Sequence, residues 1–211
     1  MAGEQRLIRV FEGGGDIHRR NAANIFRKKE EEVTGDEREL AKRIVHASNY
    51  GVGPITFSRN AGVPVPEAKR LLNAYFSEYP AIKLWHLDMA SKLRKSRTLT
   101  TPFGRKRTFF NRWADSLLRE AYAYIPQSVV VEVINTGLRR LYEKVKQENL
   151  GIDILLQNHD ALLCQVKTEE VQKAGEIIKG CLNVPVLVNH REYYIPTEIS
   201  IGDNWYDLKK A

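Results

Sequence analysis

The chain has 211 residues, of which 33 are Lys or Arg and 26 are Asp or Glu, so its net charge of +7 favours a polyanionic partner. No run of about 18 apolar residues exists and the first residues lack the apolar core of a secretion signal, so we expect no membrane partner. Cys164 and Cys181 lack metal-type spacing, which predicts reduced thiols and a cytoplasmic location. The length suits one sizeable core, with room for two lobes.

A glycine-rich break at Gly13–Gly15 precedes a predicted helix that begins with Asp16 as its N-cap. His18 lies in the first turn of this helix. On the sequence pattern alone, His18 is explained as well by an ordinary surface position as by a role in a binding site.

The segment Gly35–Gly53 is the most informative stretch of the chain. Asp36 is a candidate N-cap, and the glycines at the far end predict a helix over about 36–50. Four side chains recur every four residues and therefore lie along one stripe of its surface: Arg38, Lys42, His46 and Tyr50. Cations followed by a ring suit a triphosphate joined to a base. Spacing alone favours the simpler alternative, a solvated charged face that ends in a core tyrosine.

Short helices are expected next, with Pro66 and Pro80 each at a helix start. Leu84, Leu87 and Leu93 are predicted to face the core from the second of these helices.

The segment Thr98–Phe110 alternates and turns as a hairpin does, with Gly104 at the permissive turn position. Arg105 and Arg107 make this hairpin basic, which favours contact with a nucleic-acid backbone over the alternative of an exposed basic turn. A long helix is then predicted from Leu117 to about Val145, broken or kinked at Pro126. Arg119 and Gln127 lie eight residues apart, close to one face of it.

A second hairpin is predicted over about 152–166, with His159 and Asp160 in its turn. Rigid strands hold an acidic residue well enough for it to serve as a metal ligand, and Mg²⁺ prefers carboxylate oxygens. Because Asn, Asp and His are also common turn residues, the motif alone favours an ordinary turn.

Taken in order, these motifs resemble the family A DNA polymerases from about Asp16 to Trp205. The fingers helix of that family carries R, K, an aromatic residue and Y-G at the same spacing, and His46 stands here in place of its Phe or Tyr. Its hairpin reads H-D-E, and Ala161 stands in place of the second acid. Further matches are D-I-H at 16–18, T-x-x-G-R-x-R at 101–107, the Arg119 and Gln127 pair, and G-x-N-W at 202–205. Ala123 stands where the family has an Asn between that Arg and Gln.

The resemblance implies an α+β fold, with a helical fingers subdomain over 1–110 and an antiparallel-sheet palm portion of a right-hand polymerase over 111–211. It implies catalytic roles for Asp160, Lys42 and His159, with Asp160 as metal ligand for two Mg²⁺ ions. The implied nucleotide-binding residues are His18, Arg38, Lys42, His46 and Tyr50. The implied DNA-binding residues are Arg105, Arg107, Arg119 and Gln127.

The implied activity is DNA-directed DNA synthesis from deoxynucleoside triphosphates on a primer-template DNA. The helix stripe of Arg38, Lys42, His46 and Tyr50 and the Asp160 carboxylate are expected to contact the same bound nucleotide. The family's other catalytic aspartate belongs to a motif that would precede Met1, so we expect no primer extension by this chain alone. We expect the upstream polymerase segment on another chain, with truncation of a longer chain or of its gene as the alternative. The alternatives are a non-catalytic nucleic-acid-binding module and single-subunit RNA synthesis. A bacterial cell or a phage-infected host cell is the expected location.

Overall fold

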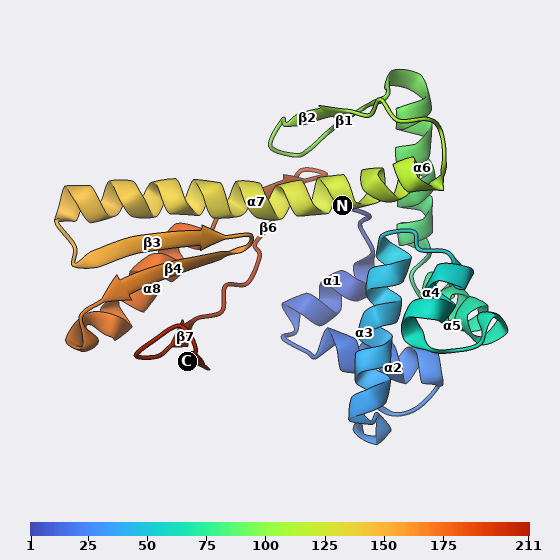
Figure 1. Cartoon of the computed structure of the whole chain (residues 1–211), viewed down its shortest axis with the longest axis horizontal. Coiled ribbons are helices and arrows are strands. Elements are labelled where there is room, and N and C mark those ends of the chain that lie inside the picture. The colour runs from blue at the N-terminus through green and yellow to red at the C-terminus, as the bar shows by residue number, and fades with distance from the viewer. The chain divides into compact units, whose positions relative to one another are not determined.

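The computed structural model describes residues 1–211 and shows an α+β fold, as expected (Figure 1). The chain divides into two compact units, which are described separately. The first comprises residues 1–99 and 106–125, and the second comprises residues 100–105 and 126–211. No helix is both long enough and apolar enough to cross a membrane.

The first unit is built mainly of helices. In chain order they are α1 Gln5–Glu12, α2 Ile17–Phe26, the short 3-10 helix η1 Glu30–Glu32, α3 Gly35–Asn49, α4 Pro54–Ala61, α5 Val65–Glu78 and α6 Pro80–Ser96. Helix α3 contacts both α2 and the α4–α5 pair (Figure 1). Fully buried side chains of α3 and α5, among them Ile44, Leu71 and Tyr75, form the core between these helices.

Helix starts follow the local signals, with one correction. Asp16 caps α2 as predicted, and prolines lie in the first turns of α5 and α6. Helix α3, however, is capped by Thr34 and not by Asp36. The Thr34 hydroxyl accepts from the Glu37 N–H at 3.2 Å and the Glu37 carboxylate accepts from the Thr34 N–H at 3.0 Å. This reciprocal pair satisfies two backbone donors, so the helix begins there and Asp36 falls within its first turn.

The buried face of α6 differs from the prediction. Leu93 is fully buried, but Leu84 and Leu87 are 65% and 61% exposed. The face turned to the core carries His86, whose Nε2–H donates to the Asn49 carbonyl oxygen at 2.9 Å and whose ring stacks on Tyr122 at 3.9 Å. Because this histidine fills a core position, the leucines one and two residues away point outward.

The basic hairpin is present as β1 Thr98–Thr100 and β2 Lys106–Thr108, with Gly104 at φ +82° in its turn. Helix α7 Asp115–Glu148 continues through Pro126, so of the two expected outcomes, a break or a kink, the break is absent. The division between the two compact units nevertheless falls at this proline, after Ile125.

The second unit places the C-terminal part of α7 beside a two-stranded hairpin and α8 on a common core (Figure 1). The hairpin is β3 Ile152–Asn158 with β4 Ala161–Val166, close to the predicted bounds. The remaining elements are η2 Thr168–Glu170, α8 Val171–Leu182, β5 Val186–Val188, β6 Arg191–Tyr193, β7 Ser200–Ile201 and β8 Lys209–Lys210. Each sheet has two strands, and Leu141, Ile152, Ala174 and Cys181 are buried in the core that α7, the β3–β4 hairpin and α8 share.

Helices α7 and α8 approach closely at Gly137. A Cβ atom at this position would lie 2.5 Å from Leu182 Cδ2 and 3.0 Å from Leu182 Cα. The first of these contacts could relax by side-chain movement, but the second involves the backbone of α8. Glycine at 137 is therefore required by packing between two helices of the same unit.

We expect Gly137→Ala to lower the free energy of unfolding by about 1–3 kcal/mol, because the added methyl group overpacks the α7–α8 contact. Gly180→Ala in α8 is the matched control, since a Cβ there meets nothing within 4 Å. That variant should gain about 0.5–1 kcal/mol from the lower backbone entropy of alanine. Urea unfolding followed by circular dichroism measures both, and equal midpoints for the two variants would contradict the assignment of this contact.

Candidate functional site

The C-terminal end of α3 is held by contacts to three other helices of its unit. The Asn49 side-chain oxygen accepts from the Tyr75 hydroxyl of α5 at 2.9 Å, and its carbonyl accepts from His86 of α6. Gly51, at φ +68°, lies against the Tyr122 ring of α7, where a Cβ atom would be 2.8 Å from Tyr122 Cδ2. Only glycine fits this conformation and this approach, so the end of the helix bearing Tyr50 has a fixed position.

Near the start of α3, Arg38 forms a two-point ion pair with Asp16, the N-cap of α2. Arg38 Nε lies 2.8 Å from Asp16 Oδ2, and Nη2 lies 3.4 Å from Oδ1. Arg38 Nη1 also lies 3.3 Å from the exposed Glu39 carboxylate. The hydrogen bond from Arg38 lowers the pKa of Asp16 below its usual range, so this carboxylate stays charged near neutral pH. Asp16 thus orients the guanidinium while Glu39 occupies its outer edge.

His18 lies within the electrostatic reach of Arg38, Lys42 and His46, so the structure brings these predicted residues together. Burial and then the positive charge of Arg38 lower the pKa of His18 below its ordinary value, which keeps the ring neutral near pH 7. Its Nδ1 atom is buried and has no hydrogen-bond partner. His18 therefore offers an unpaired ring nitrogen beside Arg38, which is paired with Asp16, and Lys42, which forms no ion pair.

Further along α3, Lys42 and His46 are exposed and Tyr50 is half-buried. The His46 and Tyr50 rings are tilted, with centroids 6.2 Å apart. A surface that carries cations at one end and rings at the other can bind phosphates and an attached nucleoside together.

The predicted DNA-binding arginines of the first hairpin are both paired with glutamates of α7. Arg105 forms an ion pair with Glu132, and Arg107 lies 3.0 Å from the Glu120 carboxylate. Arg107 also lies over the Phe109 ring, 4.7 Å from its centroid. These contacts position the two cations and partly neutralise them, and the sequence pattern did not indicate them.

Arg119 and Gln127 are both exposed on α7. The stem of Arg119 passes close to Gly51, since a Cβ there would be 3.9 Å from Arg119 Cγ. Arg119 therefore lies beside the Tyr50 end of α3, within the first unit.

Asp160 and His159 form the two-residue turn of the β3–β4 hairpin, which Asn158 and Ala161 close as the last pair. His159 adopts φ +52°, a left-handed conformation common at tight turns. The hairpin is tied to α7 by a 2.9 Å hydrogen bond from the Gln157 amide to Asn135. Asp160 is exposed at the tip and free to bind a ligand.

The carboxylate of Asp160 suits Mg²⁺ chemically, but it has no acidic, His or Cys cluster around it. The structure contains no group of three or more such residues able to hold a metal ion. Asp160 is therefore a single exposed carboxylate at the hairpin tip, and its proposed role as a metal ligand is a prediction.

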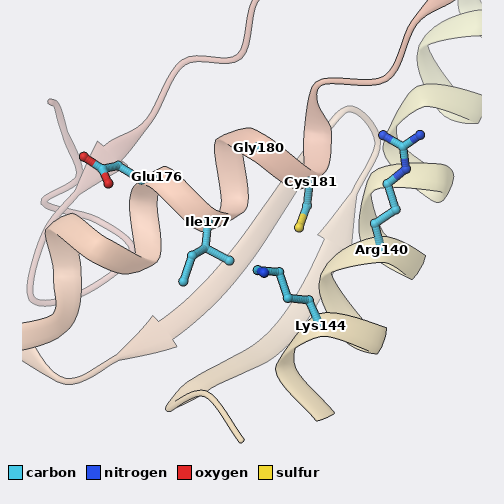
Figure 2. A pocket seen from close by; sticks show the side chains of 6 residues that line it. All are labelled: Arg140, Lys144, Glu176, Ile177, Gly180 and Cys181. Atoms are coloured by element: carbon cyan, nitrogen blue, oxygen red, sulfur yellow. The ribbon is translucent and has the colours of Figure 1, made fainter. Parts of the chain in front are cut away.

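A separate pocket lies between α7 and α8, with a volume of about 540 Å³ (Figure 2). Lys144 extends from α7 toward Ile177 and Cys181, while the Glu176 carboxylate turns away (Figure 2). Burial raises the pKa of the Cys181 thiol, so it stays protonated and poorly nucleophilic. None of the predicted site residues lines this pocket.

Residues 1–207 match the family model of DNA polymerase family A, and the chain belongs to this family. DNA polymerase I of Caldicellulosiruptor bescii is 29% identical over 98% of this chain and 25% of its own length. The thermostable DNA polymerase I of Thermus aquaticus is 26% identical over 100% of this chain and 25% of its own length. The chain thus spans about a quarter of the length of these relatives.

The fold is also similar to a solved structure, the POL domain of Pol1 from M. smegmatis in complex with DNA primer-template and dNTP. The TM-score is 0.80 at 24% identity, over 86% of this chain and 33% of that one. The comparison confirms the polymerase-type α+β fold.

The pKa of His18 provides a test of the cation cluster. Because this pKa is lowered on folding, the unfolded chain binds more protons, and the histidine's contribution to stability is lost as the pH falls below about 6.5. A bound polyphosphate should reverse the effect and raise the His18 pKa. We expect the His18 ring signal in NMR to titrate at higher pH when inorganic tripolyphosphate is added. In the ligand-free protein, Arg38→Gln should raise the His18 pKa. A His18 pKa at or above 6.5 in the unsubstituted, ligand-free protein would contradict the grouping of His18 with these cations.

Proposed function

We propose that this chain is the C-terminal part of a DNA-directed DNA polymerase that adds deoxynucleotides to a primer 3′ end once an upstream segment completes it. The observation that carries the proposal is the grouping of His18 of α2 with Arg38, Lys42 and His46 of α3, in a chain whose residues 1–207 match family A. The first unit would then correspond to the fingers and the second to the rear of the palm. The similar M. smegmatis domain was solved in complex with DNA primer-template and dNTP, and we infer the same partners here.

In this proposal Arg38 and Lys42 bind the triphosphate of the incoming nucleotide, with His18 and His46 beside them. The fixed Tyr50 packs against the nascent base pair. Lys42, whose three N–H donors can follow phosphate oxygens as charge develops, stabilises the transferring group.

The hairpin tip of the second unit carries the proposed metal ligand. Asp160 would hold Mg²⁺ together with carboxylates of the completing segment, and His159 sets the turn that presents it. When bound, the ions activate the attacking 3′ oxygen and stabilise the leaving pyrophosphate. Arg105, Arg107, Arg119 and Gln127 are proposed to contact the DNA, with the arginines positioning it irrespective of sequence.

A second candidate is a non-catalytic nucleic-acid-binding module derived from a polymerase. The observation in its favour is Ala161, which stands next to Asp160 where the resembling hairpin has a second acid. Under this alternative the basic surfaces remain functional and Asp160 is dispensable.

The relatives named above are bacterial proteins, which supports the expected location in a bacterial or phage-infected cell.

The proposed need for a completing segment is tested by primer extension. The purified chain is expected to give no product alone and to support synthesis when mixed with the upstream part of a family A polymerase from the same genome. Omitting Mg²⁺ should abolish that synthesis. Robust extension by the chain alone would sink the proposal of an incomplete active site.

The role of Asp160 is tested in the same assembly. We expect Asp160→Ala to reduce synthesis by about three orders of magnitude or more, since a lost metal ligand removes several kcal/mol of transition-state stabilisation. Asp153→Ala is the matched control, because Asp153 is an exposed carboxylate on the same hairpin but lies far from its tip, opposite Gln165. If both variants keep full activity, the non-catalytic module explains this hairpin better.

A further inference from the structure

A basic and aromatic surface that the proposed function does not use lies where the end of α6 meets the segment after β2. We call it the Trp113 patch. Its members are Arg94, Arg97, Phe110, Arg112 and Trp113. All of them belong to the first compact unit.

The patch is held together by specific contacts. Arg97 donates from Nη2 to the Asn111 carbonyl oxygen, and its own carbonyl accepts from the Phe109 N–H at 2.8 Å. The guanidinium carbons of Arg94 and Arg97 lie 5.2 Å and 5.9 Å from the centroid of the Trp113 ring. These cation–π contacts fix the ring, which is still 41% exposed.

The charge of the patch is not compensated by protein. Arg94, Arg97 and Arg112 form no ion pair, in contrast with the neighbouring hairpin arginines, Arg105 and Arg107, which pair with glutamates of α7. Guanidinium groups without a carboxylate partner attract phosphates, and each can bind a phosphate with two N–H donors.

The patch also exposes aromatic surface. The Phe110 side chain is 88% exposed, which leaves almost the whole ring in water. Because Phe110 and Trp113 are three residues apart, their Cα atoms are at most about 10 Å from each other. Aromatic rings at short separation beside uncompensated cations are typical of sequence-independent binding to single-stranded nucleic acid.

We propose that the Trp113 patch binds single-stranded DNA, with Phe110 and Trp113 stacking on unpaired bases and Arg94 and Arg112 contacting phosphates. Duplex DNA fits less well, because its paired bases do not offer their faces to side chains. In a completed polymerase the bound strand would be the unpaired part of the template. That last assignment rests on the proposed function, whereas binding of the strand does not.

The test is fluorescence anisotropy of a labelled oligothymidine titrated with the full chain at several salt concentrations. Phe110→Ala should weaken binding about tenfold through lost stacking and leave the salt dependence unchanged. Arg94→Gln should reduce the slope of log affinity against log salt by about 0.7, the value for one phosphate contact to a single strand. Because Phe110 is exposed, its substitution is not expected to unfold the chain, and circular dichroism checks this.

Arg59→Gln is the matched control, since Arg59 is an exposed, unpaired arginine of α4 in the same unit. It should leave affinity and slope unchanged. Equal losses for Arg59→Gln and Arg94→Gln, a Phe110→Ala loss that is as large for a duplex of the same length, or an unaffected Phe110→Ala variant would each overturn the proposal. The assay contains no nucleotide and no extension step. It therefore tests strand binding even if the proposed polymerase function is wrong.

Discussion

The ion pair between Asp16 and Arg38 links α2 to α3 and orients the Arg38 guanidinium, the first side chain of the predicted nucleotide-binding stripe. Both side chains are about a third exposed, so the pair contributes only about 0–1 kcal/mol to stability. Its importance is geometric. Asp16 is already fixed by the N–H groups of His18 and Arg19, and it holds two of the guanidinium donors in turn. The Arg38 guanidinium is therefore oriented before a ligand binds, which lowers the conformational entropy lost on binding.

The glutamates paired with the hairpin arginines are compatible with DNA contact at the same residues. An ion pair as exposed as that of Arg107 with Glu120 is worth at most about 1 kcal/mol. A phosphate can replace such a carboxylate as the partner of the arginine at little net cost in free energy. Without a phosphate, Glu120 holds the Arg107 side chain in place. Arg94 and Arg97 of the Trp113 patch differ, because the Trp113 ring holds both, a backbone carbonyl also holds Arg97, and neither forms an ion pair.

Local signals in the sequence predicted much of the fold. The cap at Asp16, the proline at the start of α6, and the β3–β4 hairpin around Asp160 each depend on neighbouring residues, and each was found where expected. The outward turn of Leu84 and Leu87 was not predictable in this way, because it follows from His86 bonding to a residue 37 positions away. Likewise, Arg38 is separated from Asp16 by 22 residues and Arg105 from Glu132 by 27. Spacing identified the cations, but only the tertiary structure shows which acids hold them.

The proposed nucleotide-binding residues belong to the first unit and the proposed metal ligand to the second, and the chain supplies more of the first set than of the second. The nucleotide-binding half is assembled within the first unit: Asp16 orients Arg38, Gly51 fixes the end of α3, and His18 lies beside the cations. The metal-binding half offers Asp160 alone, on a rigid turn. Recognition of a triphosphate would, under the proposed function, require only residues of the first unit, whereas phosphoryl transfer would require further carboxylates. Under the proposed function, binding and chemistry should be separable: this polypeptide should recognise a nucleotide that it cannot by itself incorporate.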